Sequence, residues 1–181
     1  MDTVIKDCEN KKYTIDDIYA LPEGERAELI DGQIYYMAPP GRTHQKLVSR
    51  LHQTIANYID AHHGTCEIYP APFAVFLNKA DNTTYLEPDL SVICDISKLD
   101  EQGCHGAPDW VIEIVSPSSR PRDYIKKLLK YGSSGVREYW IADPDEKLVT
   151  VYQFEKETMI QYTFGSDIPV GIFSNFSIRI Q

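Results

Sequence analysis

The first third of the chain has an apolar and polar pattern that predicts a β-hairpin between two helices. Residues 13–21 are typical of a short helix that ends near Pro22. Two β-prone runs within residues 27–39 flank Asp31 and Gly32, and an Asp-Gly pair in this place is a strong hairpin signal. A long amphipathic helix is predicted over 43–63, with a buried face made of Leu47, Val48, Leu51, Ile55, Tyr58 and Ile59.

The rest of the chain alternates strand-like runs with one more helix. Residues 89–94 and 110–115 are apolar runs typical of central strands, and the polar connection between them has room for a short helix. A helix is predicted over 121–131, closed by Gly132 and Gly135. The remaining strands are predicted within 65–77 and at 138–142, 148–152, 158–164 and 176–180. The expected fold is therefore α/β (α+β), with a core in the order helix, three strands, helix, strand, preceded by the hairpin and followed by a β meander.

The length of the chain fits one domain. A chain of 181 residues is long enough to bury its own core, so we expect a single domain over residues 1–181. No apolar run reaches the roughly 18 residues that a membrane helix needs. The segment Met1–Lys12 is polar and lacks the apolar centre of a signal peptide. A cytoplasmic location is the resulting expectation.

The four cysteines are spread along the chain, at positions 8, 66, 94 and 104. No two of them form the C-x-x-C spacing of a zinc cluster. Cys94 lies in an apolar strand-like run, where a cysteine usually serves as a small core residue. Reduced thiols are the expectation for a cytosolic protein.

The net charge of -9 argues against tight, non-specific binding of nucleic acid, which depends on lysine and arginine contacts to phosphate. A locally basic groove is still compatible with an acidic chain. Basic residues gather around two of the predicted helices: Arg42, Lys46 and Arg50 near the start of 43–63, and Arg120, Arg122, Lys126, Lys127 and Lys130 around 121–131. They form one basic patch if both helices face the same cleft, and solvated helix faces otherwise.

Two carboxylates stand out against this background. Glu113 interrupts the apolar run Trp110–Val115, where an acidic side chain is costly unless it is paired, hydrogen-bonded or bound to a cation. Asp89 begins the other central strand, where it would by itself be read as a turn or cap residue. Together, on adjacent strands, the two form a hard-oxygen site suited to Mg²⁺ or Mn²⁺. The alternative for Glu113 is an internal ion pair, for example with an arginine.

A third candidate lies on the following helix. Asp123, Lys127 and Tyr131 are spaced four residues apart and therefore share one helix face. Lys127 either forms a surface pair with Asp123, stabilising the helix by about 0.2–0.5 kcal/mol, or extends to the carboxylates. In the second case a lysine there stabilises charge that develops on a phosphate or orients the attacking water.

At this point the sequence resembles a known group of proteins, the PD-(D/E)XK superfamily of restriction-endonuclease-like folds, and within it the Uma-type family. The order of core elements matches. So do several stretches that together cover most of residues 27–152: Glu28–Gly32, Met37–Pro40 with His44, Pro88-Asp89, Gly106–Ser118, Arg122-Asp123 with Lys127 and Tyr131, and Gly135–Pro144.

The resemblance implies roles for individual residues. Asp89 matches the aspartate of the P-D motif and Glu113 the second acidic residue, both as metal ligands, with the Ile114 carbonyl as a further ligand. The superfamily lysine normally lies two positions after the glutamate, where this chain has Val115. In the closer family that lysine has moved to the next helix, which favours Lys127.

Three further positions carry open alternatives. Lys126 is the other lysine on the helix, but it falls about 100° around the axis from Lys127. Glu28 is either an additional carboxylate of the metal site or an ordinary polar residue of the hairpin. His44 either contacts phosphate and assists proton transfer or caps the long helix.

The function that the resemblance implies is a metal-dependent endonuclease that hydrolyses phosphodiester bonds of DNA with Mg²⁺ or Mn²⁺. A homodimer is compatible with it, because paired sites would cut both strands. The first alternative is a nuclease-like fold that binds nucleic acid or protein with weak or no turnover. A second alternative, a metal-free carboxylate pair as in glycosidases, has no other support in the chain.

Overall fold

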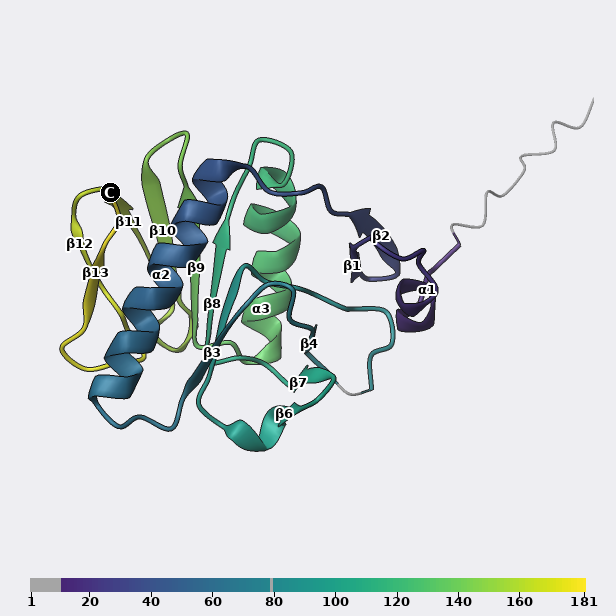
Figure 1. Ribbon diagram of the computed structural model, residues 1–181, viewed down its shortest axis with the longest axis horizontal. Helices are drawn as coiled ribbons and strands as arrows, with labels where there is room; N and C mark the ends of the chain where they lie inside the picture. The colour runs from purple at the N-terminus through teal and green to yellow at the C-terminus, as the bar shows by residue number, and fades with distance from the viewer. Residues whose placement is uncertain (1–10, 79) are drawn as a thin grey trace, which may run out of the picture.

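A computed structural model describes residues 11–78 and 80–181, so most of the polar segment Met1–Lys12 lies outside the described residues. Its centre is a mixed six-stranded sheet (Figure 1). In sheet order the strands are β11 (Thr158–Thr163), β10 (Leu148–Gln153), β9 (Glu138–Asp143), β8 (Trp110–Ile114), β5 (Leu90–Ile93) and β3 (Glu67–Pro70). The predicted mixed α/β class is confirmed, and β9, β10 and β11 form the expected antiparallel meander after a parallel β8–β9 pair.

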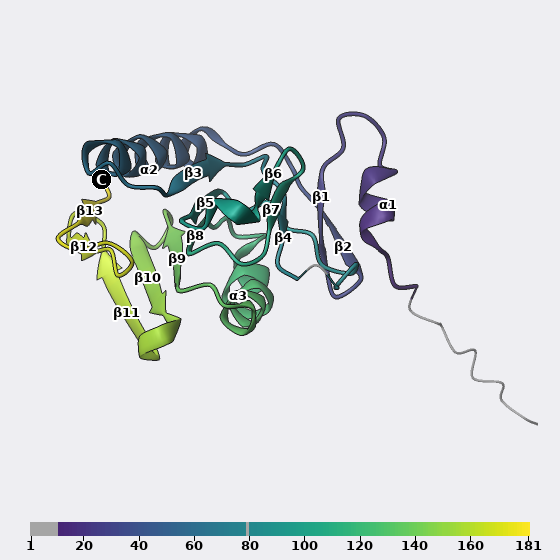
Figure 2. The ribbon, with the colours of Figure 1, turned by 90° about the horizontal axis from the view of Figure 1, so that it is seen from below.

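Helices cover both faces of this sheet (Figure 2). On one face lies α2 (Arg42–Ala61), because its apolar positions recur on one side of the helix. Five of the six residues predicted for that side are buried there: Leu47, Val48, Leu51, Ile55 and Ile59. The sixth, Tyr58, is partly buried and donates its hydroxyl to the Ser174 carbonyl at 2.9 Å.

The other face carries a π-helical turn, η2 (Arg122–Lys127), that continues as α3 (Leu128–Ser134). The predicted helix is therefore longer than 121–131, since Gly132 lies inside it and the helix ends at Gly135, in the left-handed region at φ 96°. Tyr131 from this helix packs with apolar side chains of β8 and β9 in the core of that face.

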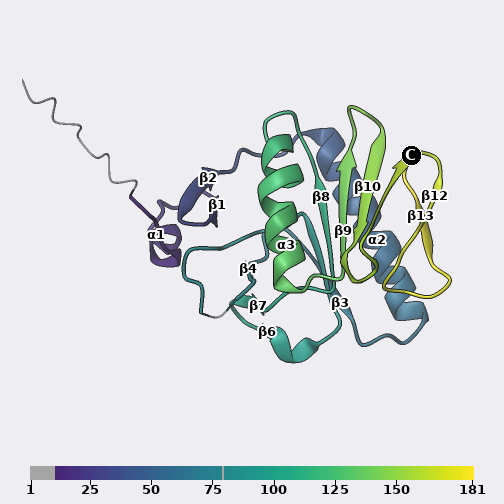
Figure 3. The same ribbon diagram turned by 180° about the vertical axis from the view of Figure 1, so that it is seen from behind.

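The N-terminal hairpin lies at one end of the molecule, next to the short helix α1 (Ile15–Tyr19) (Figures 1 and 3). Its strands are β1 (Ala27–Ile30) and β2 (Gln33–Tyr36), as predicted. Asp31 and Gly32 form the turn with φ values of 53° and 79°, the positive values that a two-residue hairpin turn of this kind requires.

Some of the short elements agree with the prediction: β4 (Val75–Phe76) lies within the strand region 65–77, β13 (Ser177–Arg179) within the strand 176–180, and the 3-10 turn η1 (Ile96–Lys98) between the central strands. Others were not predicted, namely β6 (Leu99–Asp100) and β7 (Gly103–His105), which form a small sheet with β4, β12 (Asp167–Pro169), which pairs with β13, and the 3-10 turn η3 (Phe154–Lys156). A strand of two or three residues is too short to display a period of two. The room for a helix between the central strands is taken by η1.

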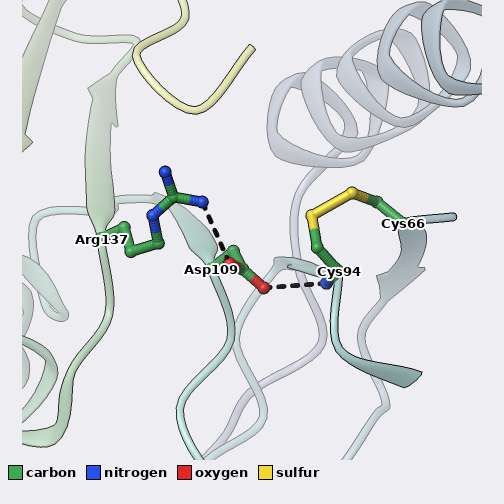
Figure 4. The surroundings of a disulfide bond; sticks show 4 residues. All are labelled: Cys66, Cys94, Asp109 and Arg137. Atoms are coloured by element: carbon green, nitrogen blue, oxygen red, sulfur yellow. Dashed lines mark hydrogen bonds and ion pairs between the residues drawn. A yellow bond between two sulfur atoms is a disulfide. The ribbon is translucent and has the colours of Figure 1, made fainter. Parts of the chain in front are cut away.

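The prediction of reduced thiols is wrong for two of the cysteines, because Cys66 and Cys94 form a disulfide (Figure 4). The antiparallel register of β3 and β5 pairs Glu67 with Ile93, which brings the two cysteines opposite each other one step further. That register depends on residues 28 positions apart, so spacing along the chain does not reveal it. Cys104 is free and buried, and Cys8 lies outside the described residues.

No helix within residues 11–78 and 80–181 is long and apolar enough to cross a membrane.

Candidate active site

A cleft of about 620 Å³ opens at the carboxyl end of β8. Its walls come from the hairpin and the loop that leaves it, the first turn of α2, the loop after β8 and the start of the η2–α3 helix. In Figure 3 the carboxyl end of β8 is the end at which the following loop leads into the helix that contains α3. All five residues singled out from the sequence line the cleft: Glu28, Asp89, His44, Glu113 and Lys127.

Strands β5 and β8 bring the two predicted metal ligands together. Leu90 lies opposite Ile112 in their antiparallel register, and one step further along this register Asp89 faces Glu113. Cross-strand neighbours of this kind have Cβ atoms about 5 Å apart. The backbone N–H of Ile114 donates to Oδ2 of Asp89 at 2.7 Å, which ties the Asp89 carboxylate to β8.

Lys127 extends from the helix into this centre. Its Nζ lies 2.7 Å from Oε1 of Glu113 and 2.8 Å from Oε1 of Glu28, and the side chain is 3% exposed. The Asp123 carboxylate, one helical turn earlier, lies 3.6 Å from the same Nζ. Lys126 points to the hairpin, where its Nζ donates to Oε1 of Gln33 at 2.8 Å. Of the two lysines, only Lys127 therefore contacts the carboxylates.

The charges of this centre do not balance. Burial raises the pKa of Glu113 well above its ordinary value; Lys127 opposes this shift, and the neighbouring carboxylates add to it. Burial also disfavours the charged form of Lys127, but Glu113, Glu28 and Asp123 outweigh it and raise the pKa of Lys127. Lys127 therefore stays protonated, while the carboxylates around it are too many for one ammonium group to neutralise.

Tyr131 completes the surroundings of Glu113. Its buried hydroxyl donates to Oε1 of Glu113 at 2.9 Å. The same oxygen also accepts a hydrogen bond from Nζ of Lys127. Burial, and then the charge of Glu113, raise the pKa of Tyr131 well above its ordinary value, so the hydroxyl remains a donor. The four-residue spacing places Asp123, Lys127 and Tyr131 on one helix face, and the fold turns that face toward Glu113.

Glu28 is an interior residue rather than an ordinary polar residue of the hairpin. Its side chain on β1 is fully buried. Oε1 accepts from the backbone N–H of Glu87 at 3.1 Å and lies 2.8 Å from Nζ of Lys127. Oε2 has no hydrogen-bond partner among the described residues, and Nε of Arg122 lies 3.7 Å away. This carboxylate belongs to the same buried group as Glu113.

His44 lies in the first turn of α2 and faces Asp89. Its Nε2 is 3.1 Å from Oδ2 of Asp89. Burial lowers the pKa of His44, but the hydrogen bond and the charge of Asp89 outweigh it, and the net effect is a raised pKa. Gly41, not His44, occupies the N-cap position of the helix. The imidazole is thus placed to hold the Asp89 carboxylate.

The donor set fits a divalent cation bound partly by water. No group of three or more His, Cys, Asp or Glu side chains within the described ranges is arranged to enclose a metal ion. Mg²⁺, however, commonly binds through one or two carboxylates and keeps several waters. Oδ1 of Asp89 and Oε2 of Glu113 accept no hydrogen bond from a described residue, while their partner oxygens do. The cleft is lined by six carboxylates but only four arginine or lysine side chains, which also favours a bound cation.

The predicted basic patch is smaller in the structure. Of its eight residues, only Arg42, Arg122 and Lys127 line the cleft. Arg120, for example, lies 2.7 Å from a carboxylate oxygen of buried Asp143. The two helices do face one cleft at their first turns, but most of their basic side chains point elsewhere.

Comparison with known proteins identifies the family of the chain. A family model described as "Uma2: Putative restriction endonuclease" matches residues 15–181. The chain belongs to the Uma2 family. The crystal structure of "a putative nuclease belonging to DUF820" from Anabaena variabilis ATCC 29413 resembles this Uma2 protein with a TM-score of 0.71, at 24% identity, over 88% of this chain and 89% of the other. At that level of identity the shared property is the fold.

A curated relative adds a partial match. An uncharacterised protein of Synechocystis sp. (strain ATCC 27184 / PCC 6803 / Kazusa) is 32% identical over 99 residues, which are 55% of this chain and 50% of the relative. The match thus spans about half the length of that Synechocystis protein.

Proposed function

We propose that this Uma2 protein is a metal-dependent endonuclease that hydrolyses phosphodiester bonds in DNA. The observation that carries the proposal is the buried centre in which Asp89 and Glu113 face each other while Lys127 bonds to Glu113. Membership of a family described as "Putative restriction endonuclease" supports it. The order α2, β3, β5, β8, α3, β9 also agrees with the core of restriction-endonuclease-like folds.

Asp89 and Glu113 would hold Mg²⁺ or Mn²⁺ through their free oxygens, with the Ile114 carbonyl as a further ligand. When bound, such an ion polarises a phosphoryl oxygen and lowers the pKa of a coordinated water.

The side chains of the protein have separate tasks in this proposal. Lys127 orients Glu113, because its ammonium donates to Oε1 of Glu113 at 2.7 Å. An ammonium group has three donors, so another can donate to a phosphate oxygen, and its positive charge then stabilises the negative charge of the transition state. His44 holds Asp89 and is an auxiliary group for proton transfer, and Glu28 is an auxiliary carboxylate. A homodimer would place two such centres on the two DNA strands.

A second function, binding without turnover, is favoured by one specific observation. Val115 is buried at the position where the superfamily carries its lysine, so catalysis depends entirely on the relocated Lys127. In that case the protein would be a nuclease-like module for nucleic acid or protein.

The test is a cleavage assay on purified protein with supercoiled, linear and single-stranded DNA, and with RNA, in the presence of Mg²⁺, Mn²⁺ or EDTA. Wild type is compared with Glu113→Gln, Lys127→Ala and Lys126→Ala. The last is a matched control, because it removes the same charge from the same helix at a residue that points to the hairpin.

We expect metal-dependent cleavage that is lost in Glu113→Gln and Lys127→Ala and retained in Lys126→Ala. Metal binding without cleavage of any substrate would favour the binding module instead. Cleavage that persists in EDTA and in Glu113→Gln would contradict the proposal.

A further inference from the structure

The guanidinium of Arg122 is a mostly buried cation with unused donors. Its side chain lines the cleft and is 19% exposed. Guanidinium carries five N–H donors, and a buried polar group normally uses them. The guanidinium of Arg122 makes no hydrogen bond to any described residue, and its Nε is fully buried without a partner. The nearest carboxylate oxygens lie 3.7 Å away in Glu28 and 4.0 Å away in Asp123, beyond hydrogen-bond distance.

Two side chains of the hairpin lie close to this group. The ring of Tyr35 on β2 lies 5.4 Å from the guanidinium carbon, within the range of a cation–π contact. Because Glu28 is near Nε, the two terminal nitrogens are left on the other edge of the group. Those nitrogens form the fork that binds two oxygens of one planar or tetrahedral anion.

The other arginines of the cleft differ from Arg122. Arg26 is occupied, since its Nε donates to Oε2 of Glu87 at 2.9 Å and a terminal nitrogen contacts the same oxygen. Arg42 is exposed at the start of α2, where a free side chain is ordinary. Arg122 is thus a desolvated arginine that lacks an acceptor and lies between Glu28 and Asp123, close to the centre formed by Lys127 and Glu113.

We propose that Arg122 binds a phosphate of the nucleic-acid backbone beside the Asp89–Glu113 centre, through the two terminal nitrogens of its guanidinium. This assignment rests on the proposed nuclease function and specifies a residue that positions its substrate. The ligand is an anion with two oxygens in reach of one fork, and its negative charge replaces the acceptor that Arg122 lacks in the protein. Arg122 carries no information about base sequence in this role.

The test measures binding, not cleavage. Fluorescence anisotropy of a labelled DNA oligonucleotide, single-stranded and duplex, is followed in EDTA with Glu113→Gln as the parent protein, so that no turnover occurs. Arg122→Gln and Arg122→Lys are added to this parent. Lys156→Gln is the matched control, because Lys156 is an exposed residue just after β10, at the end of the sheet opposite the cleft. Urea denaturation establishes that each variant is folded.

Losing one phosphate contact should lower the salt dependence of binding by a defined amount. For Arg122→Gln we expect binding weakened roughly tenfold and a slope of log K against log salt that is smaller by about 0.9 for duplex or about 0.7 for single strands. Arg122→Lys should keep the slope and bind more weakly than the parent, because a lysine retains the charge without the fork. Lys156→Gln should match the parent.

The two proposals fail in different ways. If the parent binds DNA and Arg122→Gln has the same affinity and slope, the role of Arg122 is overturned while the nuclease proposal stands. If the parent binds neither form of DNA at any salt concentration, the role of Arg122 is overturned, and the nuclease proposal is decided separately by the cleavage assay with metal.

Discussion

Lys127 has three carboxylates around one ammonium group, with Glu113 at 2.7 Å, Glu28 at 2.8 Å and Asp123 at 3.6 Å. Burial of the excess negative charge costs free energy unless a proton or a cation joins it. Protonation is one solution, which is why the pKa of Glu113 is raised. A divalent cation at the free oxygens is the other. Protons and a metal ion would therefore compete for this centre, and acid should weaken its affinity for a metal ion.

His44 gives a prediction about pH and stability. Its pKa in the folded protein is raised above the ordinary 6.5 by the hydrogen bond and charge of Asp89, which outweigh burial. Protonated His44 therefore stabilises the folded protein. This contribution is complete at pH values below the pKa of His44 in the unfolded chain, and it is lost as pH rises through the higher pKa of His44 in the folded protein. His44→Gln should lower the free energy of unfolding by about 1–2 kcal/mol in mild acid and by much less above about pH 8.

The measurement is urea denaturation of wild type and His44→Gln across this pH range, without metal. His52→Gln is the control, since His52 is on the same helix but makes no ion pair among the described residues. If the stability difference between wild type and His44→Gln does not change with pH, or grows as pH rises, protonated His44 does not form a stabilising ion pair with Asp89.

Sequence alone predicts some of these residues better than others. Glu113 is conspicuous because a carboxylate inside an apolar strand needs a partner. Lys127 follows from helical spacing together with the family resemblance. Arg122 was noted in a basic cluster and in a stretch that resembles the family, but its phosphate-binding role was not predicted, because that role depends on the positions of Tyr35 and Glu28 from the hairpin. The contact between the hairpin and Arg122 is a tertiary contact, and the local pattern of residues along the chain does not reveal it.

At the scale of elements, the long α2 and the central strands were predictable because their periodicity extends over many residues. The turn at Asp31 and Gly32 was predictable because it needs positive φ angles. The end of the η2–α3 helix was misjudged at Gly132. That glycine is not a stop signal; an added Cβ would lie 2.9 Å from Cε1 of Phe154, so glycine lets the helix pack closely against this ring.

This reading of Gly132 is testable by a double-mutant cycle. Alanine is normally about 1 kcal/mol better than glycine inside a helix. In the wild-type background we expect Gly132→Ala to lower the free energy of unfolding by about 1 kcal/mol, because overpacking against Phe154 outweighs that gain. In a Phe154→Ala background the same substitution should stabilise the protein by about 1 kcal/mol. Equal effects in both backgrounds, measured by urea denaturation, would exclude the close contact as the reason for the glycine.

The disulfide joins the edge strand β3 to β5, the strand that follows Asp89 (Figure 4). Asp109 supports this end of β5, since it accepts from the backbone N–H of Cys94 at 2.8 Å and pairs with Arg137. A cross-link over 28 residues restricts the unfolded chain. Its reduction should therefore cost about 3 kcal/mol of stability, or roughly 10 °C in melting temperature.

Melting with and without reductant measures this effect. The double variant Cys66→Ser, Cys94→Ser should melt near the reduced wild type, and reductant should not change its melting temperature. The melting temperature of Cys104→Ser should still fall when reductant is added. Identical melting of the wild type in both conditions would show that the cross-link does not contribute to stability.

For the whole molecule, the layered fold and the net charge act together. Two helices on opposite faces of the sheet converge at the carboxyl end of β8, so the cleft collects residues from the hairpin, α2, β8 and the η2–α3 helix. The chain carries a net charge of -9 and presents few basic residues there, so electrostatic attraction of DNA is weak without added cations. A divalent cation would both neutralise the centre and favour approach of a phosphate.

Metal binding should therefore appear in the stability of the folded protein, independently of any cleavage. A ligand that binds only the folded state stabilises it by about 2.7 kcal/mol at a concentration of 100 times its Kd. Mg²⁺ or Mn²⁺ should thus raise the melting temperature of wild type by several degrees, and EDTA should reverse the shift. Asp89→Asn and Glu113→Gln should abolish most of it, whereas Asp167→Asn, which removes an exposed carboxylate paired with Arg179, should not. If all four proteins respond equally to the metal, the ion binds elsewhere and the assignment of Asp89 and Glu113 as ligands fails.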